Sequence, residues 1–234
     1  HITQERAHWW GIEKTSDGGK CRLIYYDSDV DKSKVKAVPA IIEGATVVGI
    51  YPDLDFTKFG NLETFYFSNS TEVSTMPSVA GCSNFLQVNT IDDNGNVKEY
   101  ELPPSITSLP DKAFQKTKLI DIKMPNVTSV GEYVFFHCNS LPITDNIRYA
   151  DTYLVEATDK NLSQYTIKAG TRFVGEDAFK GCSAFQSIEI PNTVTYIGNS
   201  AFQGCSSLTS VTIPNSVMSI GNYAFQFCSS LTSV

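Results

Sequence analysis

Positively charged residues are scarce in this chain. Its 234 residues include 18 Lys and Arg against 25 Asp and Glu, which gives a formal net charge of −7. A protein that binds nucleic acid needs a cluster of cations to contact the phosphate groups. The sequence holds no such cluster, so we expect no nucleic-acid partner.

Long apolar runs and catalytic motifs are also lacking. No apolar stretch reaches the length of about 18 residues that a membrane-spanning helix needs, and the N-terminal residues do not read as a signal peptide. The three histidines, His1, His8 and His137, are too few and too scattered for a zinc site. Neither a nucleophile elbow nor a phosphate-binding loop occurs. We expect no metal, no cofactor and no membrane span, with any signal or anchor segment lying outside this chain.

What the chain has in abundance is internal repetition. The segment Ile197–Cys205 recurs 23 residues later as Ile220–Cys228, and an earlier copy spans Val174–Cys182. The copies continue into a phrase such as Leu208–Asn215, with the pattern Leu-x-x-Val-x-Ile-Pro-Asn. Repeats of about 20 to 29 residues with this pattern are typical of leucine-rich-repeat solenoids. We predict an α/β leucine-rich-repeat right-handed solenoid, with a parallel β-sheet on its concave face and short strands and helical or 3₁₀ turns outside.

The repeat phrase predicts which side chains face the core. Its first, fourth and sixth residues should point inward and its third and fifth outward, because successive side chains of a strand alternate between two faces. Degenerate copies of the phrase begin at Leu62, Val97, Leu119 and Leu162. We expect the following aromatic segment, for example Asn199–Gly204, to form a short helical or 3₁₀ turn on the outer side.

Residues 1–37 read as a β-hairpin cap that precedes the repeats. Two strand-like runs flank the turn residues Ser16–Gly19. The first turn of a solenoid has no preceding neighbour to cover its core. Adjacent Trp9 and Trp10 have the size and apolar character to cover it.

The solenoid itself is predicted over residues 38–234. It is irregular over 38–173 and has regular 23-residue repeats over 174–234. Hairpin insertions are expected near 86–100, where Asn94-Gly95 is a strong turn signal, and near 149–165. Loops on one face of a solenoid often carry recognition.

The six cysteines follow the repeat frame. Five of them occupy the position three residues after the aromatic residue of the frame, or a position that matches it: Cys82, Cys138, Cys182, Cys205 and Cys228. In the copy that begins at Leu109, Thr117 fills this position. Because the position accepts either Cys or Thr, we interpret it as a small buried side chain and expect free stacked thiols and no disulfides.

The segment Cys205–Phe225 resembles the BspA-like, or Treponema-type, leucine-rich repeat. The resemblance is specific over residues 170–234 and is recognisable, with insertions and deletions, from about residue 38 onward. It implies a secreted or cell-surface protein, often bacterial, that adheres to host proteins or to other cells. It also implies that the chain has no catalytic residues.

Two departures from the repeat are visible. The copy Val130–Leu141 continues into Pro142–Asp145 in place of a full strand phrase, so we expect an interruption of the sheet there. The chain stops at Leu231–Val234, in mid-repeat and without a polar cap. An uncapped end exposes a strand edge. We therefore expect either a fragment of a longer array or end-to-end self-association through this repeat.

The outward strand positions and the hairpins form the candidate ligand-binding surface. Glu99 and Glu101 are expected to face the same side of one strand, but an open solenoid face is too wet to raise the pKa of one carboxyl for glycoside hydrolysis. Tyr149 and Tyr153 offer aromatic anchors on the second hairpin. The candidate surface comprises Tyr66, Glu99, Glu101, Asp121, Lys123, Tyr149, Tyr153, Gln164 and Glu189.

Three functions remain open at this stage. We expect a non-catalytic, extracellular or cell-surface module for protein binding or adhesion, whose partner is a protein or glycan on a host or neighbouring cell. The alternative is a structural spacer within a larger surface protein. A carbohydrate-active enzyme is a remote alternative.

Overall fold

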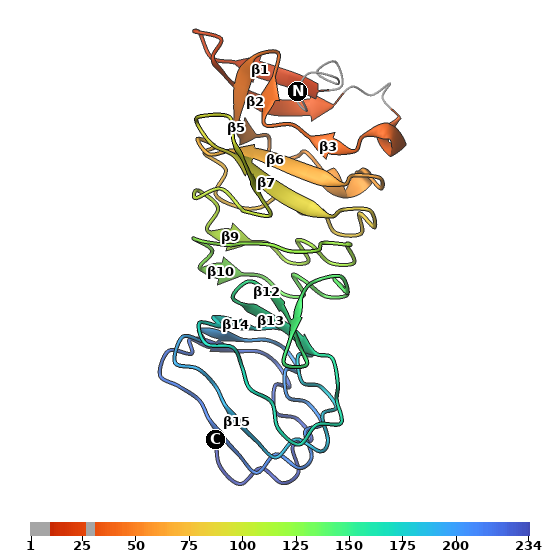
Figure 1. Ribbon diagram of the computed structural model, residues 1–234, viewed down its shortest axis with the longest axis vertical. Coiled ribbons are helices and arrows are strands. Elements are labelled where there is room, and N and C mark those ends of the chain that lie inside the picture. Colours follow the sequence, from red (N-terminus) through yellow and green to blue (C-terminus); the bar gives the residue numbers. More distant parts are fainter. Residues whose placement is uncertain (1–9, 27–30) are drawn as a thin grey trace. The chain divides into compact units, whose positions relative to one another are not determined.

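The computed structural model describes residues 10–26 and 31–234, so His1, His8 and Trp9 lie outside the described residues. The chain divides into two compact units, residues 1–140 and 141–234. In each unit the described residues wind into turns of a β-solenoid with parallel sheets and almost no helix (Figure 1). The predicted leucine-rich-repeat solenoid is confirmed.

The first unit begins with a four-stranded sheet in which an antiparallel hairpin is joined by two later strands. The strands, in sheet order, are β1 (Trp10–Lys14), β2 (Lys20–Tyr26), β5 (Ala45–Ile50) and β4 (Ile41–Ile42). Trp10 is 5% exposed, and its ring centroid lies 5.7 Å from that of Phe59 and 6.2 Å from that of Phe56. The indole therefore packs on the aromatic core of the turn that follows. The boundary of a cap at residue 37 stays a prediction.

The rest of the first unit is built from parallel strands and one hairpin. Its second sheet comprises, in order, β3 (Ala37–Val38), β6 (Thr64–Ser68), β7 (Gln87–Ile91) and the antiparallel β8 (Val97–Glu99). A two-stranded parallel sheet follows, formed by β9 (Ser108–Leu109) and β10 (Ser129–Val130). Two 3₁₀ helices, η2 (Lys32–Lys34) and η3 (Phe56–Lys58), are preceded by the N-cap residues Asp31 and Asp55, whose side chains accept hydrogen bonds from the backbone.

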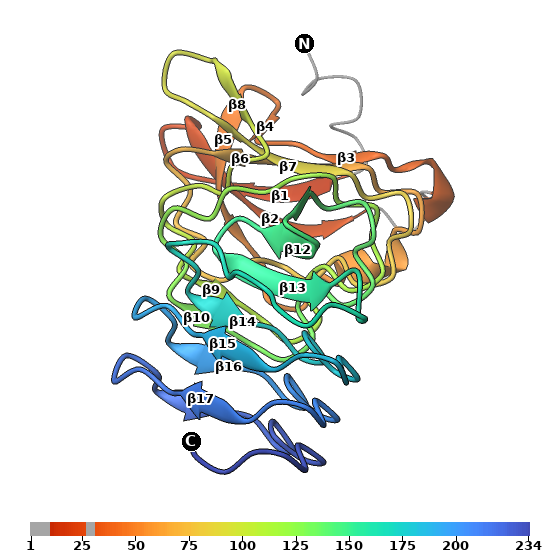
Figure 2. The same cartoon turned by 60° about the horizontal axis from the view of Figure 1, so that its bottom comes forward.

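The second unit contains a six-stranded sheet and a parallel strand pair. The larger sheet comprises β11 (Ile143–Thr144), β12 (Ile147–Ala150), β13 (Tyr153–Ala157), β14 (Phe173–Val174), β16 (Tyr196–Ile197) and β18 (Ser219–Ile220). Strands β11 to β13 are antiparallel and the later strands are parallel. The pair comprises β15 (Ser187–Glu189) and β17 (Ser210–Thr212). Figure 2 shows the successive turns of this unit stacked side by side.

The core of the second unit repeats with the sequence. Leu208 and Val211 are buried, whereas Ser210 and Thr212, which alternate with them, are exposed. The alternation predicted from the repeat phrase is confirmed here. The aromatic residue of the frame forms a ladder: the Phe202 ring stacks at 5.2 Å on Phe179 and at 5.2 Å on Phe225. Each ring fills the space above the ring of the preceding turn.

The outer turns are not helical, contrary to the expectation for segments such as Asn199–Gly204. Within 175–182, the Lys180 N–H donates to the Asp177 carbonyl at 3.1 Å, but the Gly181 N–H donates to Gln203 in the next turn at 2.8 Å. A helix would keep all such bonds within its own segment. Asp177 (φ 58°) and Gly181 (φ 78°) are left-handed, which also breaks a right-handed helical path. The hydrogen bonds between turns take the place of helical ones.

All six cysteines lie in the described part of the chain as buried, unbridged thiols, as predicted. The thiols of Cys205 and Cys228 donate to the carbonyls of Phe179 and Phe202, at 3.2 and 3.0 Å. Burial is the main reason why the pKa of Cys205 rises to about 12 and that of Cys82 to about 11. We expect these buried thiols to be unreactive in the folded state, since the thiolate is the nucleophile.

The raised pKa of Cys205 predicts a loss of stability at alkaline pH. The protonated thiol of Cys205 makes its full contribution to the free energy of unfolding below the ordinary pKa of 9.0. This contribution is lost as the pH rises through about 12, because only the unfolded chain releases the proton easily. We expect each pH unit in this window to cost about 1.4 kcal/mol for this thiol.

The matched variant for this test is Cys205→Thr, because Thr already fills the equivalent position at residue 117. Its melting temperature should fall less steeply than that of the unmodified protein between pH 9 and 11. A thiol-specific reagent should label Cys205 only on unfolding. Rapid labelling in the native protein, or equal pH slopes for the two proteins, would contradict the prediction.

Candidate functional site

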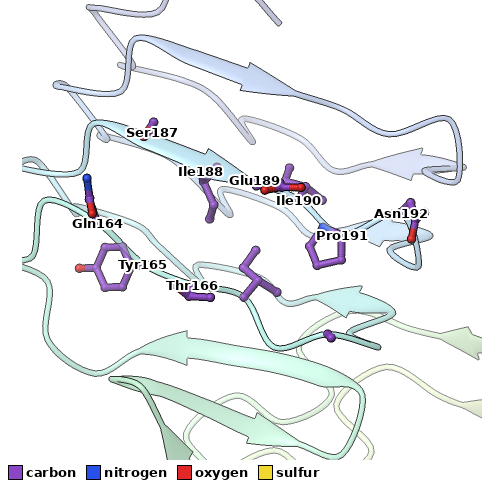
Figure 3. A pocket seen from close by; sticks show the side chains of 11 residues that line it. Gln164, Tyr165, Thr166, Ser187, Ile188, Glu189, Ile190, Pro191 and Asn192 are labelled. Carbon is purple, nitrogen blue, oxygen red and sulfur yellow. The ribbon is translucent and has the colours of Figure 1, made fainter.

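A polar groove lies on the outward face of the second unit (Figure 3). It is open and has a volume of about 710 Å³. The close-up shows Gln164 at one end and Asn192 at the other. The lining residues are Gln164, Tyr165, Thr166, Ile167, Ala169 and Ser187–Asn192.

The register of three successive turns builds this groove. Gln164 forms a parallel bridge with Ser187, and β15 pairs with β17 so that Ser187 lies beside Ser210 and Glu189 beside Thr212. Adjacent strands lie about 4.8 Å apart. The outward side chains therefore stand in two rows, Gln164-Ser187-Ser210 and Thr166-Glu189-Thr212. Inward-pointing Tyr165 and Ile188 are 7% and 9% exposed and form the floor.

The groove offers hydrogen-bonding side chains and one negative charge. Glu189 is the one charged residue among those that line it, and its side chain is exposed. The rows otherwise present amide and hydroxyl groups, which both donate and accept. A glycosidase needs a second carboxyl across the cleft, and the residues that line this groove do not supply it. The groove is suited to binding polar groups.

Within residues 10–26 and 31–234, no group of three or more His, Cys, Asp or Glu residues has an arrangement that could bind a metal ion. The same part of the chain contains no helix that is both long enough and apolar enough to cross a membrane.

The structure brings together only some of the residues expected to form one surface. Gln164 and Glu189 both line the groove of the second unit. Asp121 and Lys123 belong to the first unit, where Lys123 forms a parallel bridge with Glu101. Lys98 Nζ lies 3.7 Å from Glu101 Oε1, so this carboxylate already has a cationic partner.

The expectation that Glu99 and Glu101 share a strand is wrong. Tyr100 has a left-handed backbone with φ 59°, and it ends β8. Glu99 consequently pairs with Asn89 inside the hairpin, whereas Glu101 pairs with Lys123 of the next turn. A left-handed residue reverses the alternation of a strand, so the two carboxylates do not act as a pair on one strand.

The expectation of exposed tyrosine anchors is also wrong. Tyr149 and Tyr153 are only 3% and 2% exposed, because β12 and β13 are part of the main sheet. The Tyr149 hydroxyl accepts a hydrogen bond from the Lys168 N–H at 2.9 Å, and burial raises the pKa of Tyr149. The Tyr153 hydroxyl donates to buried Glu176 at 3.0 Å. Both rings are therefore structural.

Tyr66 is likewise unavailable to a ligand. It is 9% exposed, and every residue of β6 is buried, so both faces of this strand are covered. Exposed aromatic side chains occur elsewhere in the first unit. Tyr51 is 48% exposed and lines a second groove of about 710 Å³ that also includes Arg22 and Glu72. A tyrosine followed by proline in a loop after a strand was the available sequence signal for it.

The in-register rows and the ladder of buried frame residues define a leucine-rich-repeat β-solenoid. The model of the BspA type leucine rich repeat region matches residues 53–142 and 153–234, in six copies. The chain belongs to this BspA-type leucine-rich-repeat family.

Several solved structures are similar over nearly the whole chain. A leucine-rich-repeat protein of T. pallidum is 20% identical, with 98% of this chain and 91% of that one covered and a TM-score of 0.49. A leucine rich cell surface protein of Faecalibacterium prausnitzii A2-165 is 16% identical, with 96% and 92% covered and a TM-score of 0.27. A leucine-rich-repeat protein of Bacteroides ovatus ATCC 8483 is 16% identical, with 95% and 91% covered and a TM-score of 0.34. No curated protein matches the chain significantly.

Proposed function

We propose that this chain is a non-catalytic binding module of adhesion type that works outside the cell or on its surface. Its ligand is a protein or glycan of a host or neighbouring cell, and its site is the groove around Gln164 and Glu189. The observation that carries the proposal is the pair of in-register polar rows over an open groove. The extracellular setting rests on the family.

The geometry of the rows favours an extended ligand. Side chains repeated about every 4.8 Å along the stack can hydrogen bond to successive units of a strand or a sugar chain. The outward rows lack the Trp, Tyr and Arg side chains that anchor tight protein interfaces. We therefore expect each single contact to be weak, and the total affinity to rise when several repeats bind the same ligand.

The first test is a screen of the purified chain against immobilised extracellular-matrix proteins and a glycan panel at physiological salt. For a protein or an uncharged glycan found in this screen, Thr166→Arg should reduce affinity at least about tenfold, a loss of about 1.4 kcal/mol, because its long side chain fills the groove. Glu189→Gln should show whether the ligand uses the charge.

The matched control is Glu13→Gln, since Glu13 is an exposed strand residue of the first unit. It should bind like the unmodified chain. A saturable protein or uncharged glycan whose affinity is unchanged by both Thr166→Arg and Glu189→Gln would remove the groove from the proposal.

One observation favours the spacer as a second candidate. Several outward hydroxyls already donate to the preceding turn: Thr209 to the Gln186 carbonyl at 3.3 Å, and Thr232 to the Thr209 carbonyl at 3.2 Å. Side chains used in this way hold turns together and are less available to a ligand. Absence of binding across both panels would favour the spacer.

Catalysis is the remaining alternative. Glu99 and Glu101 were its candidate residues, and they pair with different neighbours, Asn89 and Lys123. Hydrolysis of any glycan that is lost on Glu99→Gln or Glu101→Gln would overturn the non-catalytic assignment.

A further inference from the structure

The outer turn of residues 131–138 carries three aromatic side chains outside the core, whereas the equivalent copy 221–228 carries two, Tyr223 and Phe227. Tyr133, Phe136 and His137 occupy positions that hold Ser, Gln and Gly in the copy 198–205. His137 is exposed, and the other two rings are half-buried. Neighbouring Val134 and Phe135 are fully buried and fill the core of this turn. The three rings are therefore additional to the aromatic ladder.

The three rings form one cluster. The Phe136 and His137 ring centroids are 4.0 Å apart, and those of Tyr133 and Phe136 are 5.3 Å apart in an edge-to-face arrangement. Such contacts hold the rings in fixed positions on the turn. The cluster presents a rigid, partly apolar surface to solvent.

The backbone at two of these positions is left-handed, as it is in the other copies of the frame. Tyr133 and His137 have φ values of 56° and 60°, in the left-handed region that disfavours residues with a Cβ atom. The copy 198–205 places Gly204 at the position of His137, with φ 77°. Non-glycine residues are left-handed at the same two positions in other copies, so the repeat sets this conformation; examples are Asp177, Ser200, Tyr223, Lys116 and Phe227. Glycine would relieve it at residue 137.

Two lysines of the preceding turn lie beside the cluster. The Lys112 N–H donates to the Glu132 carbonyl at 2.8 Å, and the Lys116 N–H donates to the Phe136 carbonyl at 2.9 Å. Both lysine side chains are exposed, and no ion pair is recorded for either within the described part of the chain. The nearby acids are Asp111, whose Oδ1 accepts from the Glu132 N–H at 2.8 Å, and Glu132 itself.

We propose that Lys112, Lys116, Tyr133, Phe136 and His137 form a binding site for an acidic glycan, a sugar chain with carboxylate or sulfate groups. The apolar face of a sugar ring can pack on the aromatic cluster, while its acidic groups contact the two lysines. An acidic peptide would engage the lysines but leave the rings unused. A nucleic acid would need a longer track of cations than two lysines in a chain of charge −7.

The test uses defined probes on the full chain. A heparin oligosaccharide supplies sulfate, a polysialic acid oligosaccharide supplies carboxylate, and dextran is the neutral control. We expect saturable binding to at least one acidic probe, no binding to dextran, and affinity that falls as salt is added. The difference between the two acidic probes identifies the preferred group. Equal binding to dextran, or tighter binding to a single-stranded oligonucleotide or poly-glutamate, would overturn the proposal.

The decisive variant is the triple change Tyr133→Ser, Phe136→Gln and His137→Gly, which reproduces the residues of the copy 198–205. It should abolish binding and leave the melting temperature unchanged or higher, because glycine relieves the left-handed position. Lys112→Gln with Lys116→Gln should weaken binding by about five- to tenfold.

Two controls separate this site from the groove. Lys180→Gln changes the lysine of another outer turn and should bind like the unmodified chain, as should Thr166→Arg. Unchanged binding in the folded triple variant would overturn the proposal. Loss of binding in Thr166→Arg would overturn it as well, because it would place the glycan in the groove.

Discussion

Gly198→Ala should lower the free energy of unfolding by about 2–3 kcal/mol or more. A Cβ atom at this position would lie 2.6 Å from the Glu176 backbone nitrogen and 2.7 Å from the Gly175 carbonyl carbon. These atoms belong to the backbone of the preceding turn, so neither can rotate away. Glycine is needed here for the close approach of two turns, and the variant must push them apart.

The control for this prediction is Gly60→Ala. A Cβ atom at Gly60 would meet nothing within 4 Å, and the residue does not have a left-handed φ. Its stability should stay within about 0.5 kcal/mol of the unmodified chain. Urea denaturation of both variants measures the difference. Similar midpoints for the two would show that backbone contact does not set the spacing of the turns.

Phe202→Ala is expected to lower the free energy of unfolding by about 3–5 kcal/mol. The ring is fully buried and stacks on one side against Phe179 and on the other against Phe225. Its removal leaves a cavity that touches three successive turns. Phe202→Leu should recover part of the loss, since it keeps most of the apolar volume.

Phe227→Ala is the matched control for the ladder. Phe227 is 71% exposed, so its truncation should change stability by no more than about 0.5 kcal/mol. Chemical denaturation followed by circular dichroism compares the three variants. Comparable losses for the changes at Phe202 and Phe227 would contradict the assignment of the stacked rings as the main packing element.

The inward and outward positions of the regular repeats could be read from the sequence. The burial of Leu208 and the exposure of Ser210 could be predicted because the same sequence phrase occurs several times in the chain. The repetition makes the alternation of inward and outward positions unambiguous. The unbridged thiols followed as well, because Thr117 stands in for Cys in one copy. Gln164 and Glu189 came from the same reasoning, and both line the groove.

Predictions from local sequence were wrong where backbone hydrogen bonds join one turn to the next. The turn 199–204 has the composition of a short helix, but the Phe202 N–H donates to Ala224 in the next turn at 2.8 Å. The sequence predicted that Tyr149 and Tyr153 are exposed on a hairpin, but their strands are part of the main sheet and both side chains are buried. One left-handed residue, Tyr100, separated Glu99 from Glu101.

The sequence by itself therefore determined the repeat, the family and the residues that face the core, because these depend on periodicity within one turn. Only the tertiary structure decided which turns bond to one another, which tyrosines are covered, and that Lys112 and Lys116 lie beside the ring cluster of the following turn. These features depend on the register between turns, and that register is set by the backbone hydrogen bonds that join one turn to the next.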